Sequence, residues 1–229
     1  MPAKKAPKKK KTEDTKPPMP VPGFLLNGPT AAPLTVALAH GAGAPMDHPF
    51  MNDFAEGLGN RGFQVARFEF PYMAYRRATH KRPPPDRPSV LIETWKSVID
   101  HFGPERLVIS GKSMGGRIAS MMASDLELLR TPVRGLVCLG YPFHPPGKPD
   151  APRTGHLQKL DTPTLILQGE RDTLGSKEEV RGYELDPKIR IHWLPDGDHG
   201  FKPRVKSGLK EADNIFEAIE MFAKFLRTL

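Results

Sequence analysis

The sequence predicts an α/β fold, with a mostly parallel sheet of about six to seven strands and helices on both faces. Runs rich in Val, Ile and Leu recur at residues 34–39, 64–69, 106–110, 134–139, 164–168 and 188–193. Segments with helical periodicity lie between most of these runs. Strands that alternate with helices favour a parallel sheet covered on both faces. Residues 24–26 are interpreted as one short additional edge strand.

Four segments place apolar residues at the spacing of a helix with one buried face. These positions are Phe50, Phe54 and Leu58; Leu91, Trp95, Val98 and Phe102; Ile118, Met121, Met122, Leu126 and Leu129; and Ile215, Ile219, Phe222 and Leu226. Ser89 is predicted to cap the second helix. Residues 176–179, Ser-Lys-Glu-Glu, have the pattern of a capping box and predict one further helix start.

The composition predicts one folded domain over residues 21–229. Of the 229 residues, 38% are hydrophobic and 26% charged, which is enough for a core, and no apolar run reaches the length of a membrane span. The single cysteine, Cys138, excludes an internal disulfide and suits a reducing compartment. The lysine-rich N-terminus lacks the apolar stretch of a secretory signal. We therefore expect a cytoplasmic location.

The net charge of +8 lies mostly in the N-terminal tail. Seven lysines and two acidic residues give residues 1–16 a charge of +5, which leaves +3 for the rest of the chain. A segment so rich in Lys and Pro cannot bury enough apolar surface to fold, so residues 1–20 are predicted to be disordered. The tail is interpreted as a solvated extension, with weak, non-specific contact to polyanions as the alternative.

Residues 111–115, Gly-Lys-Ser-Met-Gly, follow an apolar strand-like run and precede a helix-like one. A sharp turn from strand to helix can hold one hydroxyl in the open, and the helix N-terminus supplies unpaired N–H groups beside it. Ser113 is therefore a candidate nucleophile. Lys112, its neighbour, could tune the electrostatics or simply fill the variable position of the turn.

A serine hydroxyl needs a base and an acid that orients the base. In an open parallel sheet, reacting groups gather at the carboxyl ends of the strands. Asp172 and His199 each follow a later strand-like run, so the chain order is Ser, Asp, His. Asp196 and Asp198 remain alternative partners for His199.

The early strand-like run at residues 34–39 ends in His40-Gly41-Ala42-Gly43-Ala44. An oxyanion needs two inward-pointing backbone N–H groups, and those of Ala42 and Met114 are the candidates. His40 is interpreted as a structural residue of this loop.

The other histidines and the cysteine carry weaker signals. His192 is interpreted as a sheet residue, Cys138 as a buried thiol, and His144 as a loop residue without a chemical role. The histidines have no acid or cysteine partner at ligand spacing, so we expect no metal site.

Two proline-rich segments, residues 76–88 and 141–162, are predicted to be loops at the carboxyl edge of the sheet, with no helical lid. Loops of this length in a compact domain are usually functional or mobile.

The motifs together resemble the α/β-hydrolases, and more narrowly the small dienelactone-hydrolase-like branch. Within this branch, the chain resembles a group named for a testis-expressed protein and a subunit of the nuclear NSL acetyltransferase complex. The similar segments are His40-Gly41-Ala42-Gly43, Phe70-Pro71-Tyr72, residues 111–117, which form the nucleophile elbow around Ser113, and residues 141–148. Dienelactone hydrolases carry cysteine at the elbow, where this chain has Ser113.

The resemblance and the candidate residues predict a cofactor-free serine hydrolase acting on a small carboxylic ester or thioester. The alternative is an interaction protein that keeps the hydrolase scaffold while catalysis is vestigial. Cleavage of peptides is a third option, which would need an extended substrate groove.

Overall fold

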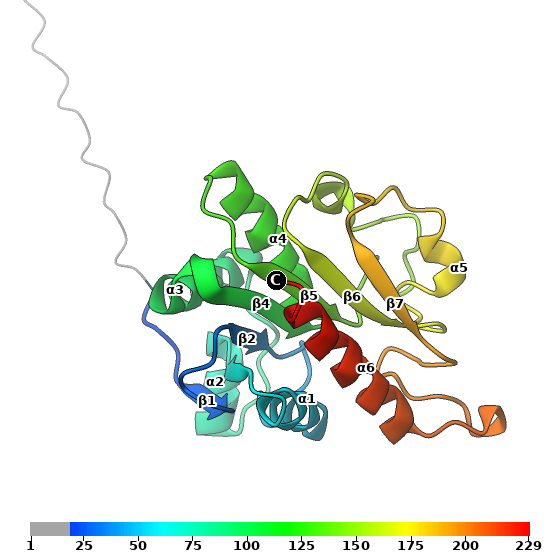
Figure 1. The fold of residues 1–229 in the computed structure, drawn as a ribbon, viewed down its shortest axis with the longest axis horizontal. Helices are drawn as coiled ribbons and strands as arrows, with labels where there is room; N and C mark the ends of the chain where they lie inside the picture. Colours follow the sequence, from blue (N-terminus) through cyan, green and yellow to red (C-terminus); the bar gives the residue numbers. More distant parts are fainter. Residues whose placement is uncertain (1–18) are drawn as a thin grey trace, which may run out of the picture.

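The computed structural model describes residues 19–229, so nearly all of the tail predicted to be disordered lies outside the described residues. The described chain forms one seven-stranded sheet in the order β1-β3-β2-β4-β5-β6-β7 (Figure 1). Strands β2 to β7 run parallel, and only the edge strand β1 pairs antiparallel, with its neighbour β3. The predicted α/β fold with a mostly parallel sheet is confirmed.

The strands lie within a few residues of the apolar runs that predict them. Their bounds are β1 Phe24–Asn27, β2 Thr35–Ala39, β3 Gln64–Phe68, β4 Leu107–Lys112, β5 Gly135–Leu139, β6 Thr164–Gly169 and β7 Arg190–Leu194. The strand order changes direction at β2, because β3 lies on one side of this strand and β4 lies on the other. Such a switch point opens a crevice at the carboxyl ends of the strands.

Helices cover both faces of the sheet. Their bounds are α1 Pro49–Gly59, α2 Pro71–Thr79, α3 Pro88–Phe102, α4 Met114–Leu128, α5 Lys177–Val180 and α6 Glu211–Leu226. α1 and α6 pack together over one face, and α3 and α4 pack together over the other (Figure 1). Within residues 19–229 no helix is both long and apolar enough to cross a membrane.

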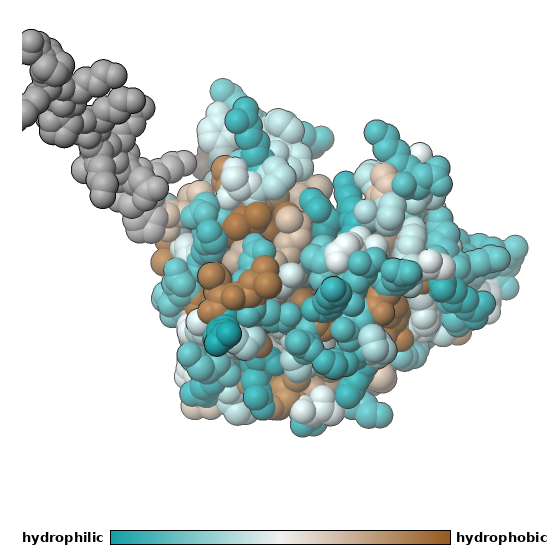
Figure 2. All heavy atoms as spheres, turned by 90° about the horizontal axis from the view of Figure 1, so that it is seen from above, coloured by the Kyte–Doolittle hydropathy of each residue, from teal (hydrophilic) through white to brown (hydrophobic). Residues whose placement is uncertain are grey.

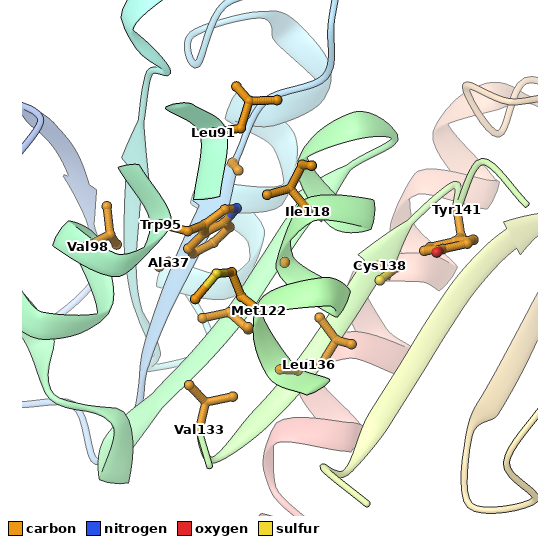
Figure 3. Packing of buried hydrophobic residues seen from close by; sticks show 14 of the residues in the cluster. Ala37, Leu91, Trp95, Val98, Ile118, Met122, Val133, Leu136, Cys138 and Tyr141 are labelled. Carbon is orange, nitrogen blue, oxygen red and sulfur yellow. The ribbon is translucent and has the colours of Figure 1, made fainter. Parts of the chain in front are cut away.

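The core lies in two layers, one on each side of the sheet. Figure 3 shows the layer under α3 and α4, where Trp95 of α3 lies against Ile118 and Met122 of α4 and above Ala37 of β2. The ring of Trp95 is fully buried and meets Phe68 edge to face, with 4.9 Å between the ring centres. The apolar spacing of both helices therefore predicts their packing face correctly.

Three local expectations are wrong. Ser89 does not cap α3, because Pro88 occupies the first helical position and Arg87 is the cap residue. Leu129 lies beyond the end of α4 and is 70% exposed. The first residues of the predicted loop 76–88 are helical, since α2 runs from Pro71, again a proline at the first position, to Thr79.

The second proline-rich segment is irregular apart from a short 3₁₀ turn, Gly155–Leu157. A hydrogen bond joins this segment to α4, because Nε2 of His156 lies 2.7 Å from Oγ of Ser120. Burial lowers the pKa of His156 to about 4, so this contact is made by the neutral ring.

On the face in Figure 2, hydrophobic patches lie among more extensive hydrophilic surface.

Candidate active site

Ser113 lies at the turn between β4 and α4, with φ of 50° and ψ of −114°. This backbone conformation is rare for a residue with a side chain. The turn requires glycine on both sides. A Cβ on Gly111 would lie 2.5 Å from the backbone carbon of Gly115, and a Cβ on Gly115 would lie 2.6 Å from the carbonyl oxygen of His40. The sequence pattern around Ser113 therefore corresponds to a sharp turn that presents the hydroxyl at the carboxyl edge of the sheet.

Ser113, His199 and Asp172 lie in hydrogen-bond contact with one another. Nε2 of His199 is 2.9 Å from Oγ of Ser113, and Nδ1 of His199 is 2.7 Å from Oδ2 of Asp172. These residues follow β4, β7 and β6, so three separate strand ends supply them. The carboxylate favours the tautomer with the proton on Nδ1, which leaves Nε2 free to accept the serine proton.

Asp172 is fully buried, and its carboxylate is held from three sides. Besides His199, it accepts hydrogen bonds from Nε2 of Gln168 at 2.9 Å and from the backbone N–H of Leu174 at 2.8 Å. A buried carboxylate needs such donors. The sequence motifs do not include Gln168, although a glutamine inside an otherwise apolar strand is a signal of a buried polar contact.

The alternative acids have other partners. The carboxylate of Asp196 binds the guanidinium of Arg204, which lowers the pKa of Asp196 to about 2. Oδ1 of Asp198 accepts hydrogen bonds from the backbone N–H groups of Gly200 and Lys202. Neither carboxylate is bonded to the imidazole of His199.

The loop after β2 runs beside Ser113 and is fixed by its carbonyl groups. The hydroxyl of Tyr72 donates to the carbonyl oxygen of Ala42 at 2.9 Å, and Nη1 of Arg76 donates to that of Gly43 at 3.1 Å. The N–H groups of Ala42 and Met114 donate to no carbonyl in the turns and loops that the structure describes. These contacts direct the loop carbonyls toward α2 and leave both candidate donors available.

His40 is buried inside this loop. Its Nε2 accepts a hydrogen bond from the backbone N–H of Phe70, and its Nδ1 lies 2.6 Å from the carbonyl oxygen of Gly41. The ring is therefore neutral with its proton on Nδ1, in keeping with the lowered pKa that burial causes. This geometry supports the structural interpretation.

In the described part of the chain, the other histidines and the cysteine make no hydrogen bond to Ser113, His199 or Asp172. Nε2 of His192 is 2.8 Å from Glu217 of α6, and Nδ1 of His144 is 2.8 Å from the carbonyl oxygen of Pro145. Cys138 is buried, and burial raises the pKa of its thiol. Within residues 19–229, no group of three or more His, Cys, Asp or Glu side chains could hold a metal ion.

A groove of about 830 Å³ begins beside the candidate site and runs between α1 and α6. Gly41, Lys112 and Gly200 border its inner end. Its apolar lining includes Phe50, Met51, Ile215, Phe216 and Ile219.

A nucleophile turn on the central strand of a mostly parallel sheet, with acid and histidine loops after later strands, defines the α/β-hydrolase fold. The model of a family described as an alpha/beta hydrolase domain matches residues 32–227. The chain therefore belongs to the α/β-hydrolase domain family.

Solved structures show the same fold at low sequence identity. Est1E from Butyrivibrio proteoclasticus with ferulic acid bound is 14% identical, with a TM-score of 0.66 over 90% of this chain and 96% of that one. An alpha-beta serine hydrolase homologue from Coxiella burnetii is 18% identical, with a TM-score of 0.64 over 90% of each chain. Dienelactone hydrolase from Anabaena variabilis is 20% identical, with a TM-score of 0.63 over 89% of each chain.

Proposed function

We propose that this protein is a serine hydrolase that cleaves a carboxylic ester or thioester through an acyl-enzyme. The observation that carries the proposal is the continuous contact from Oγ of Ser113 through the imidazole of His199 to the buried carboxylate of Asp172. A hydroxyl becomes a useful nucleophile when a base can take its proton as it attacks, and this contact supplies the base.

In the proposed mechanism, Oγ of Ser113 attacks the substrate carbonyl while Nε2 of His199 takes the hydroxyl proton. The N–H groups of Ala42 and Met114 bind the resulting oxyanion, each contributing on the order of 3 kcal/mol to the lowering of the barrier. The intermediate then expels the alcohol or thiol, which leaves with the proton from His199. Water attacks the acyl-enzyme with the same histidine as base, and the acid is released with Ser113 restored.

The groove between α1 and α6 supports a substrate with an apolar part. Its inner end lies next to the loop of Ala42 and to the residue before Ser113, and its lining is mostly apolar. The serine at the elbow, in place of the cysteine of dienelactone hydrolases, favours ordinary esters or thioesters over dienelactones. We propose a cytoplasmic location because the single cysteine is a buried free thiol, as reducing compartments favour.

The test is a panel of nitrophenyl esters and acyl-CoA thioesters of graded chain length, assayed with the wild type and with Ser113→Ala. We expect turnover by the wild type, and in the folded Ser113→Ala variant a loss of at least about 10³-fold in kcat. Undiminished hydrolysis by this variant would exclude Ser113 as the nucleophile.

Labelling with a fluorophosphonate probe tests the alternative that catalysis is vestigial. We propose from its motifs that the protein is related to the testis-expressed and NSL-subunit group, and kinship with a complex subunit motivates this alternative. Rapid labelling of Ser113 requires a working base and oxyanion site. A folded protein that the probe does not label, and that turns over no ester, would instead be an interaction protein.

A further inference from the structure

Lys112 ends β4, directly before Ser113, and its ammonium group contacts the loop that carries His199. Nζ donates a hydrogen bond to the main-chain carbonyl oxygen of His199. The same nitrogen lies over two aromatic rings, 5.2 Å from the ring centre of Phe50 and 5.4 Å from that of Phe201. Cations bind favourably to the faces of aromatic rings, and more so where water is displaced.

The backbone around this contact leaves room only for the ammonium group and the carbonyl. A Cβ on Gly140 would lie 2.6 Å from Nζ of Lys112 and 3.0 Å from the carbonyl oxygen of His199. Gly140 has a φ of 64°, which favours glycine for a second reason. Phe201, which supplies one of the rings, is fully buried. Its φ is 72°, a backbone conformation that residues with a side chain rarely adopt. The turn after β5 and the histidine loop are therefore both shaped around Nζ.

The surroundings of Nζ of Lys112 suit a cation better than a neutral side chain. Its surroundings are two ring faces and a carbonyl oxygen, and the negative charges of Asp172 and Asp198 also act on it. An apolar side chain could pack between the rings but would leave the carbonyl of His199 without this donor.

We infer that Lys112 is a positioning residue of the proposed serine-hydrolase site, on which this inference rests: its ammonium group holds the main chain of His199 so that the imidazole reaches Ser113. Asp172 fixes the ring of His199 at Nδ1, and Lys112 fixes the main chain of the same residue. Because Lys112 is bonded covalently to Ser113, one side chain sets the separation between the nucleophile and its base.

The first variant is Lys112→Met, which keeps an unbranched apolar stem between the rings and removes the donor. We expect kcat for a nitrophenyl ester to fall about 10- to 100-fold while KM stays within about threefold, because the base is displaced but the substrate groove remains. The rate of fluorophosphonate labelling should fall in parallel. Urea unfolding establishes that the variant is folded under the assay conditions.

The second variant, Lys112→Ala, allows chemical rescue. n-Propylammonium has the three carbons and the nitrogen that this substitution removes, and the groove between α1 and α6 gives it access to the site. We expect it to restore labelling and turnover by about tenfold, while n-propanol, of the same shape but uncharged, restores neither. Ser113→Ala with n-propylammonium measures direct aminolysis of the ester by the amine.

A spectroscopic readout does not depend on turnover. The proton between His199 and Asp172 is expected as a downfield ¹H resonance in the wild type, assigned by its loss in His199→Gln. Loosening of the histidine loop in Lys112→Met should broaden this resonance through exchange with water, and n-propylammonium should sharpen it in Lys112→Ala.

The outcomes separate the two proposals. Wild-type kcat, labelling rate and ¹H resonance in folded Lys112→Met would overturn the inference and leave the serine-hydrolase proposal intact. Equal rescue by n-propanol would also overturn it, because a neutral donor of the same shape would then serve as well as the ammonium group. A wild type that neither turns over esters nor is labelled would overturn the proposed function, and with it a role of Lys112 in catalysis.

Discussion

The imidazole of His199 and the carboxylate of Asp172 meet at 2.7 Å across the carboxyl ends of β6 and β7. The carboxylate is fully buried and the imidazole is partly exposed, with 31% of its side chain accessible. The proposed acid is thus fixed within the protein, and the proposed base remains accessible beside Ser113.

Asp172→Asn should lower kcat by about 10³- to 10⁴-fold. The amide oxygen can accept the hydrogen bond from Leu174 N–H, which leaves the amide NH₂ to face Nδ1 of His199. The imidazole would then carry its proton on Nε2 and could not accept one from Ser113. Steady-state hydrolysis of a nitrophenyl ester measures the effect. Asp196→Asn is the matched control, expected to keep kcat within about twofold because Asp196 binds Arg204 and not His199. A loss of less than tenfold in Asp172→Asn would contradict the assigned role of the acid.

Tyr72→Phe should lower kcat about tenfold with little change in KM. Burial raises the pKa of Tyr72, so its hydroxyl stays protonated and donates to the carbonyl oxygens of Gly41 and Ala42. Without this donor, the loop that presents the N–H of Ala42 is less firmly oriented, and removing one oxyanion donor outright costs about 10²- to 10³-fold. Tyr75→Phe, an exposed tyrosine on the same helix, is the control and should leave kcat unchanged. Equal kcat values for the two variants would exclude the role proposed for Tyr72.

The activity of the wild type should fall as the pH rises through about 8. Burial lowers the pKa of Lys112 from 10.5 to about 8, although the charges of Asp172 and Asp198 partly oppose this shift. Above this pH the amine is neutral and donates a weaker hydrogen bond to the carbonyl of His199. In Lys112→Met the decline near pH 8 should be absent from the pH profile of kcat.

Stability should change in the opposite direction over the same range. Between about pH 8 and 10.5, Lys112 is protonated in the unfolded chain but neutral in the folded protein. The unfolded state then binds more protons, so this lysine makes the free energy of unfolding rise with pH. Urea unfolding of the wild type relative to Lys112→Met isolates this contribution. A contribution from Lys112 that falls with the activity would instead attribute the decline to unfolding.

The sequence predicts the fold, and where the signal is local it predicts the positions of the candidate catalytic residues at one edge of the sheet. The turn at Ser113 depends on glycines within two residues of it, so a short motif is sufficient to predict it. Asp172 and His199 are placed at the same edge by the rule that parallel strands end together. The choice among Asp172, Asp196 and Asp198 could not be made from spacing, because all three follow strands, and contacts with Arg204 and with loop N–H groups are what distinguish them.

Residues whose partners are distant in sequence could not be predicted. Tyr72 contacts Ala42 across 30 residues of sequence, and Lys112 contacts His199 across 87 residues. A third residue, Gln168, contacts Asp172. Gln168 is close to Asp172 in sequence, but its role depends on how the chain turns after β6. The error at Leu129 has a simpler cause, because apolar spacing shows which face of a helix is buried and not where the helix ends.

Gly115→Ala should destabilise the protein and abolish activity, although alanine favours helix over glycine by about 1 kcal/mol. Gly115 is the second residue of α4, and a Cβ there would lie 2.6 Å from the carbonyl oxygen of His40 and 2.8 Å from that of Ala39. Relief requires β2 and α4 to separate, which costs about 1–3 kcal/mol and moves the loop of Ala42 away from Ser113. Urea unfolding and ester hydrolysis measure the two effects. Gly23→Ala is the control, since a Cβ there meets nothing within 4 Å, and both stability and kcat should stay near the wild-type values. A fully active Gly115→Ala protein would show that the close approach of β2 to α4 is not needed for the active geometry.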